Sequence, residues 1–285
     1  MKKILLISLM LCCANVFAQK TQRPIVTSNN SSIAKVEYVE ISELTTDVKI
    51  SGRFDGSGRI ALQQGTYLVV TDSYGVEYKY PFMFMKDEAG ESMELGQWYS
   101  KTGDWSLTIS FMKIPAGYTI ISVREPDLDG TEGWKFDGIR ITNPAKSPIS
   151  KKWLAKASAQ DVAKAYYEAY VKEGDMEKAL MCEGDFLGLS KSQQINRIRN
   201  ERSTWEDNQA LASLLTLSFI DEVTQRSDSR GKYDAIVEVP VSTLAGTVKF
   251  TMKMKKGKQG WSVEDMDVDM EKESDTGSSR NNKKN

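Results

Sequence analysis

Apolar and polar residues alternate in short runs through the first half of the chain. Val76, Tyr78 and Tyr80 alternate with Glu77 and Lys79, which places three apolar side chains on one face of a strand. Runs of the same character, separated by glycine and proline turn residues, lie at 36–41, 48–54, 67–70, 105–111, 118–123 and 134–141. Because these short strands follow one another without a helical stretch, the pattern predicts an all-β, two-sheet antiparallel sandwich over residues 33–143.

The hydrophobic period changes in the second half of the chain. Residues 144–156 contain two prolines and several polar residues, which indicates a linker. Two pairs beyond it, Ser158 with Asp161 and Ser190 with Gln193, have the spacing of a capping box. Apolar residues after the first pair recur every three or four positions. This part of the chain is therefore predicted to be helical. Gly174 is expected to end the first helix, and Asp175 can cap the next one.

Strands are expected again in the last third. Runs at 217–225, 233–241, 247–254 and 260–268 follow a leucine-rich helical segment around Leu211, Leu214 and Leu215. Residues 157–269 are therefore predicted to form an α+β domain, and the charged segment 270–285 is predicted to be disordered.

The first eighteen residues are typical of a signal peptide. Two lysines precede an apolar run of about ten residues, which is too short to span a bilayer. Cleavage is expected between Ala18 and Gln19, with lipidation at Cys12 or Cys13 as the alternative. Residues 19–32 are polar and aperiodic, and are predicted to form a flexible arm. We expect an exported protein that is periplasmic, outer-membrane-associated or secreted, with no transmembrane segment in the mature chain.

Composition narrows the range of functions. The formal net charge is -1 and both signs are interspersed, so no nucleic-acid partner is expected. The chain has no histidine, and Cys182 is the one cysteine beyond residue 18, which removes histidine-dependent catalysis and the usual zinc sites. The sequence also has no glycine loop of the phosphate-binding kind. We therefore expect no enzymatic activity and no cofactor.

Three motifs in the second half are shared with a known family. They are a helix with an aromatic face at 161–170, the segment Gly-Asp-Met-Glu-Lys-Ala-Leu at 174–180, and a hairpin at 247–255 that leads to Gly260 and Trp261. Over residues 157–269 the chain resembles NTF2-like domains, more closely the lumazine-binding-like domains of unknown function in exported bacterial proteins. The resemblance implies an NTF2-like cone in which helices pack on a curved antiparallel sheet.

The first half has motifs of its own. They are Thr-Tyr-Leu at 66–68, Gly-Val-Glu-Tyr at 75–78, the strand at 105–111, and a late segment from Trp134 to Ile139. Together they resemble an immunoglobulin-like β-sandwich module of exported proteins from Bacteroidetes-type bacteria. This resemblance bears on fold and location, because such modules share no established chemistry.

The NTF2-like resemblance also implies a cavity lined by an acid and by tyrosines. Tyr166, Tyr167, Tyr170 and Asp185 are the residues of this sequence that fit those roles. Some cones of this family are isomerases or dehydratases, so weak chemistry of that type, or binding of a small apolar molecule, is the alternative function. The competing interpretation is that the tyrosines pack against the sheet with their hydroxyl groups at its rim.

Two other groups of residues are candidates for binding. Trp98 and Tyr99 lie next to a glycine-containing turn and suit stacking on a glycan, although tryptophans are mostly buried and a structural role is the alternative. Asp127, Asp129 and Glu132 resemble a calcium loop. A polar turn is favoured there, because the glycine comes too early for an EF-hand.

The sequence thus predicts an exported, non-enzymatic binding or scaffolding protein. Its partner is an unidentified small molecule or an envelope protein. Homodimerisation through the strand at 248–254 is an alternative, although the lysines of that strand favour exposure to solvent.

Overall fold

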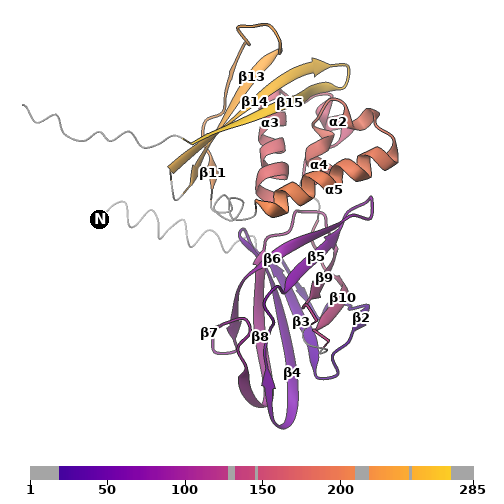
Figure 1. Cartoon of the computed structure of the whole chain (residues 1–285), viewed down its shortest axis with the longest axis vertical. Coiled ribbons are helices and arrows are strands. Elements are labelled where there is room, and N and C mark those ends of the chain that lie inside the picture. The colour runs from indigo at the N-terminus through magenta and orange to yellow at the C-terminus, as the bar shows by residue number, and fades with distance from the viewer. Residues whose placement is uncertain (1–18, 128–131, 145–146, 209–217, 244–245, 271–285) are drawn as a thin grey trace, which may run out of the picture.

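The computed structural model describes residues 19–127, 132–144, 147–208, 218–243 and 246–270 (Figure 1). The chain is mostly β, with 47% strand and 19% helix. A large curled antiparallel sheet occupies one end of the molecule, and a smaller sheet with the helices occupies the other. We call the first part, residues 19–143, the β-unit. The helices form the helical layer, and β11 to β15 form the C-terminal sheet.

The β-unit is one continuous ten-stranded sheet with the order β1-β3-β4-β8-β6-β5-β9-β10-β2, and β7 is paired to β6. Seven of these strands overlap the alternating runs of the sequence, because one face of each run is buried; β1, β2 and β7 do not. Their bounds are β1 Gln19–Gln22, β2 Ser28–Asn29, β3 Ala34–Ile41, β4 Thr45–Ile60, β5 Tyr67–Thr71, β6 Glu77–Asp87, β7 Ser92–Met93, β8 Tyr99–Met112, β9 Ile120–Arg124 and β10 Lys135–Arg140.

This sheet corrects the predicted immunoglobulin-like sandwich of two sheets. The long neighbours β4 and β8 shift register between Phe54 and Ser57, and Gly56 and Gly103 adopt positive φ there, so the two strands turn together. Strand β6 pairs with β5 in its first half and with β8 in its second, with a second shift between Phe82 and Phe84. One sheet therefore curls into a half-barrel around the core, because single strands continue from one side of it to the other.

The N-terminal segment spans the two ends of the curled sheet. Residues 19–32 are predicted to be a flexible arm, whereas the structure pairs β1 with β3 and β2 with β10. Between these strands, the backbone amide of Arg140 donates to the carbonyl of Ile25 at 2.8 Å. Main-chain hydrogen bonds hold the arm in place. Because its side chains are polar, the pattern of hydrophobic positions does not reveal this order.

The second half combines short helices with the C-terminal sheet, whose order is β11-β13-β14-β15, with β12 paired to β13. Both predicted capping boxes are confirmed, at Ser158 and at Ser190. The helical bounds are α2 Lys151–Leu154, α3 Ala159–Tyr166, the π-helical η2 Tyr167–Glu173, α4 Met176–Met181, the 3₁₀ turn η3 Phe186–Gly188 and α5 Lys191–Asp207. The strands are β11 Phe219–Ile220, β12 Thr224–Arg226, β13 Ala235–Thr243, β14 Gly246–Gly257 and β15 Gly260–Met270. The helical segment predicted around Leu211 to Leu215 and the predicted tail beyond Met270 lie outside the described residues.

The predicted cone with helices on a curved sheet is also corrected. Helix α3 packs on β13 and β15, whereas α5 is turned toward the β-unit and places Ile198 and Trp205 in the core of that unit. The capping box at Ser190 predicts where α5 begins, but this polar helix gives little periodic signal of a buried side. The sequence therefore does not predict that the β-unit covers part of it.

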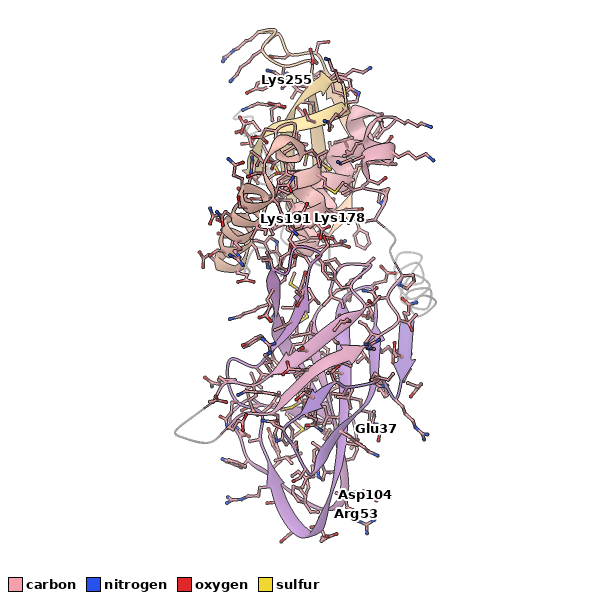
Figure 2. The ribbon with its side chains drawn as sticks, turned by 90° about the vertical axis from the view of Figure 1, so that its right-hand side faces the viewer. Glu37, Arg53, Asp104, Lys178, Lys191 and Lys255 are labelled. Carbon is pink, nitrogen blue, oxygen red and sulfur yellow. The ribbon has the colours of Figure 1, made fainter. Side chains whose placement is uncertain are left out.

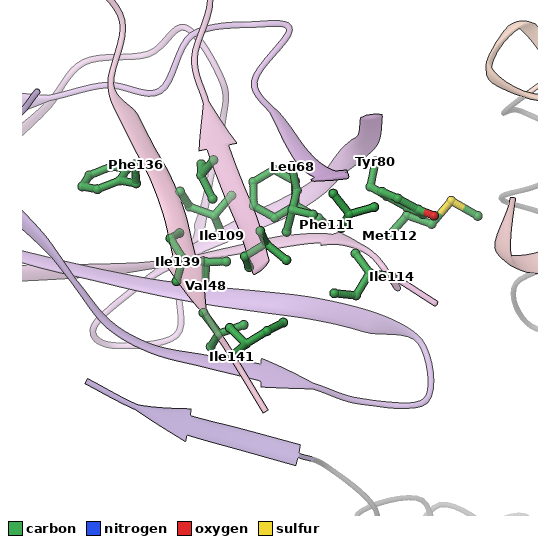
Figure 3. Packing of buried hydrophobic residues seen from close by; sticks show 14 of the residues in the cluster. Val48, Leu68, Tyr80, Ile109, Phe111, Met112, Ile114, Phe136, Ile139 and Ile141 are labelled. Carbon is green, nitrogen blue, oxygen red and sulfur yellow. The ribbon is translucent and has the colours of Figure 1, made fainter. Parts of the chain in front are cut away.

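Two hydrophobic cores result. One lies under the C-terminal sheet and includes Val162, Tyr167 and Phe250. The other fills the β-unit (Figure 3) and continues into the helical layer through Met176, Leu180, Phe186, Ile198 and Trp205. The β-unit and the helical layer therefore share one core across their junction. Among the described residues, no helix is both long and apolar enough to cross a membrane.

Candidate functional site

Arg202 of α5 lies at the junction between the helical layer and the β-unit and contacts both parts. Its side chain is 2% exposed, and its guanidinium group lies 4.9, 4.7 and 4.1 Å from the ring centroids of Tyr78, Tyr80 and Trp205. Nη1 donates to the carbonyl oxygen of Gly174 at 2.9 Å, and Nη2 donates to that of Lys79 at 2.5 Å. Nε donates to Oε1 of Glu206 at 2.9 Å, which forms an ion pair within α5. The buried arginine is thus satisfied by one carboxylate, by aromatic faces and by main-chain oxygens drawn from both parts.

Gly174 makes this arrangement possible. It ends η2 in the left-handed region with φ 64°, and a Cβ built there would lie 2.3 Å from Nη1 of Arg202. Glycine adopts that conformation at little cost and leaves room for the guanidinium group. The sequence predicts the helix end at Gly174, but the buried arginine beside it comes from a helix 28 residues further on.

A cavity of about 340 Å³ opens beside this junction. Its walls are the turn after β5, the loop before β9 and the first turn of α4, and Lys178 on its rim is labelled in Figure 2. Across the junction, the amide and the hydroxyl of Ser73 donate hydrogen bonds to the carboxylate of Glu177 at 3.2 and 2.9 Å respectively. The cavity volume falls at the lower end of the range for small-molecule sites, about 300–1,000 Å³, and interfaces between domains are a preferred location for such sites.

Asp175 is the buried acid of the cavity. It is 3% exposed, and its Oδ1 accepts hydrogen bonds from the amide of Lys178 at 3.2 Å and from the hydroxyl of Tyr118 at 3.3 Å. Among the described residues, no hydrogen-bond donor reaches Oδ2. Burial raises the pKa of Asp175 to about 6, and the neighbouring charge of Glu177 adds to the shift.

The other acids of the cavity already have internal donors. Asp72 is buried, and accepts hydrogen bonds from the amides of Tyr74 and Val76 and from the hydroxyl of Tyr78. Burial nevertheless raises the pKa of Asp72. The sequence identifies Asp175 as a helix cap, whereas the approach of Asp72 and Tyr118 to it depends on the tertiary structure.

Three of the four residues predicted for an NTF2-like cavity come together in the helical layer. Tyr166 and Tyr170 stack at 5.3 Å, and their hydroxyls donate to Glu183 at 3.1 Å and to Glu201 at 2.6 Å. Arg197 donates to Glu183 and also, at 3.0 Å, to the exposed Asp185, which completes the cluster. Glu183, Arg197 and Glu201 were not predicted from the sequence. Of these, only Arg197 and Glu201, four residues apart on α5, have a spacing that is readable as helical charge pairing.

Tyr167 does not join this cluster. It is fully buried on the opposite side, packs on Phe250 at 4.8 Å, and has its hydroxyl 3.0 Å from Oγ of Ser218. Successive helical residues point about 100° apart, which separates Tyr167 from Tyr166. Tyr167 is therefore part of the core under the C-terminal sheet.

Glu183 lines a second, smaller cavity of about 200 Å³ next to Trp261 and Gly184. Burial raises the pKa of Glu183 to about 7, although the guanidinium of Arg197 acts in the opposite direction. The neighbouring Cys182 is buried, and burial raises its pKa to about 12, so its thiol stays protonated at neutral pH.

Trp98 and Tyr99 lie at the surface of the β-unit. Trp98 is 62% exposed, and Arg59 lies 5.6 Å from its ring centroid. The Tyr99 hydroxyl accepts from the amide of Glu94 at 2.6 Å and donates to Gln97 at 3.2 Å. The ring of Trp98 is thus available for stacking, while the hydroxyl of Tyr99 stabilises the neighbouring turn through these hydrogen bonds.

Two of the three side chains predicted as weak metal candidates form ion pairs with a lysine. Lys135 pairs with Asp127 at 3.1 Å and with Glu132 at 3.3 Å, and Asp127 also accepts from the amide of Gly133. Asp129 lies outside the described residues. Within the described part of the chain, no group of three or more acidic or cysteine side chains is arranged to hold a metal ion.

No family model and no curated protein matches this chain.

Proposed function

We propose that this chain is an exported, non-enzymatic binding protein of the bacterial envelope, and that it binds a small molecule in the junction cavity. The observation that carries the proposal is Asp175, a buried carboxylate with one oxygen unused by the protein, which lines a cavity of about 340 Å³. A ligand that donates to this oxygen would complete the hydrogen bonding of a largely buried carboxylate.

The scaffolding part of the proposal is supported by the shared core and by Arg202. A site between two parts of a protein needs those parts held in fixed relation. The continuous hydrophobic core and the buried guanidinium hold the cavity walls in this way. Export rests on the amino-terminal sequence, and the destination is the periplasm, the outer membrane or the medium.

A second candidate function is proton transfer at Glu183. The observation that favours it is a carboxylate with a pKa of about 7 at the wall of a cavity and 3.1 Å from the hydroxyl of Tyr166. Against it, both oxygens of Glu183 are engaged, one by Tyr166 and the other by Arg197. We therefore place binding at the junction first.

Native mass spectrometry of the mature protein, purified from its own periplasm or culture medium, tests the proposal. The wild-type chain is expected to retain a small mass that is lost on mild denaturation. Ile120 is 52% exposed and lines the cavity, so Ile120→Trp is expected to obstruct it and abolish the bound mass. Ile25→Trp, at a residue 68% exposed on the arm, is the matched control and should retain it.

A bare wild-type chain would contradict binding of a retained ligand at the junction. A bound mass that survives Ile120→Trp but is lost in Glu183→Gln would move the site to the second cavity.

A further inference from the structure

We infer that the ligand of the junction cavity carries a primary ammonium group, which Asp175 binds through its free Oδ2. This inference rests on the proposed function and names the chemical class of its ligand.

The charge of the walls favours a cation. Asp72, Asp175 and Glu177 line the cavity, and Lys178 is the one cationic side chain among its described lining residues. Three carboxylates facing one ammonium group leave a net negative wall, which disfavours an anionic ligand and attracts a cationic one.

The hydrogen-bonding pattern of the walls leads to the same class. The hydroxyls of Ser73 and Tyr118 already donate to Glu177 and to Asp175, so these donors are used within the protein. Asp175 offers an acceptor, and a charged N–H donor to a carboxylate forms a stronger hydrogen bond than a neutral hydroxyl does.

The end of α4 is not itself the binding site. Oδ1 of Asp175 already caps the amide of Lys178, and the inference concerns the second oxygen of the same carboxylate. The remaining wall is mixed, with hydroxyl side chains at Thr71, Thr119 and Ser147. Its apolar part lies on the β-unit side, where Ala116, Ile120 and the ring of Tyr118 line the cavity and a short hydrocarbon arm of the amine would pack.

The test compares n-butylammonium chloride with n-butanol, which have the same chain length and differ in charge. Titration of the full mature chain, stripped of bound ligand by reversible mild denaturation, is followed by saturation-transfer NMR at low ionic strength and pH 7.5. The ammonium compound is expected to bind at least about tenfold more tightly than the alcohol, because an ion pair in a partly buried site is worth more than about 1.4 kcal/mol.

Three variants locate the effect. Asp175→Asn keeps a good helix cap and is expected to weaken n-butylammonium binding about tenfold while leaving n-butanol unchanged. Ile120→Lys and Ile120→Glu place opposite charges at one exposed position of the rim, and are expected to weaken and strengthen binding about threefold respectively. Glu91→Gln, on an exposed turn away from the cavity, is the control and should change nothing.

The outcomes separate the inference from the proposed function. Equal binding of the amine and the alcohol, or a neutral or anionic mass released from the native protein, would overturn the ammonium assignment and leave the junction site in place. Binding of the amine unaffected by Asp175→Asn and by both Ile120 variants would also overturn it. If neither probe binds and no mass is released, both the inference and the proposed function are wrong.

Discussion

Replacing Arg202 with methionine is expected to destabilise the protein by about 3–5 kcal/mol. Methionine keeps much of the side-chain volume but leaves the carbonyl of Lys79 without its donor in a buried junction, and removes one of the two donors to the carbonyl of Gly174. It also leaves Glu206 without its ion-pair partner. Each hydrogen bond from a charged donor is worth about 1.5–3 kcal/mol, and a desolvated cation–π contact about 2 kcal/mol. The cost of burying the guanidinium offsets part of this sum. Removing one partner from a buried charged network costs about 3–5 kcal/mol, which sets the expected range.

Equilibrium urea unfolding, followed by tryptophan fluorescence and by circular dichroism, measures this change. The ring centroid of Trp205, one of six tryptophans, lies 4.1 Å from the guanidinium, so part of the fluorescence change reports on the junction. The two signals are expected to coincide in the wild type and to separate in the variant, because the shared core then loses its fixed contact between the β-unit and the helical layer.

The control is Arg226→Met, whose exposed guanidinium lies 3.4 Å from Glu238. Exposed ion pairs contribute little, so a change within about 0.5 kcal/mol is expected. A loss of less than about 1 kcal/mol in Arg202→Met, with coincident transitions, would refute the role assigned to this residue.

Two further predictions follow from the burial of particular side chains. Burial raises the pKa of Asp175 to about 6 in the folded chain, compared with about 3.8 in the unfolded chain. The protonated carboxyl group therefore stabilises the fold fully below pH 3.8, and this contribution is lost as the pH rises through about 6. The free energy of unfolding at pH 4.5 minus that at pH 7.5 is therefore expected to be smaller in Asp175→Asn than in the wild type by about 2 kcal/mol. Urea titrations giving equal differences would contradict the burial argument. Trp98→Ala is expected to change the free energy of unfolding by less than about 0.5 kcal/mol, because that side chain is 62% exposed. Trp105→Ala is expected to cost about 3–5 kcal/mol, because Trp105 is 3% exposed and stacks on Trp134. Similar losses in these two tryptophan variants, measured by the same unfolding assay, would show that Trp98 is part of the core.

The long strands of the β-unit and the helix starts at Ser158 and Ser190 are determined by the sequence alone. Alternation with period two and capping side chains act over a few residues, so they are visible without knowledge of the fold. The stop at Gly174 is local in the same way, because it depends on the conformational freedom of one glycine.

The pairing of those strands was decided by the tertiary structure. The pattern of burial in β6 is the same whether its partner is β5 or β8, so periodicity predicted two sheets where one sheet curls. The polar arm at 19–32 is ordered by main-chain hydrogen bonds, which leave no trace in side-chain hydrophobicity. The resemblances to NTF2-like and immunoglobulin-like families remain untested predictions, while the fold inferred from them was wrong.

In the candidate site, too, the local relations were predictable from the sequence and the long-range contacts were not. The sequence identified Asp175 as a cap and placed Tyr166 and Tyr170 on one helix face, because those relations span a single turn. It did not bring Asp72, Tyr118 and Arg202 to Asp175 and Gly174, since these contacts join residues 28 to more than 100 positions apart. Local chemistry determined which side chains suit a cap or a helix face. The packing of α5 and α4 against the β-unit decided which of them share a buried junction.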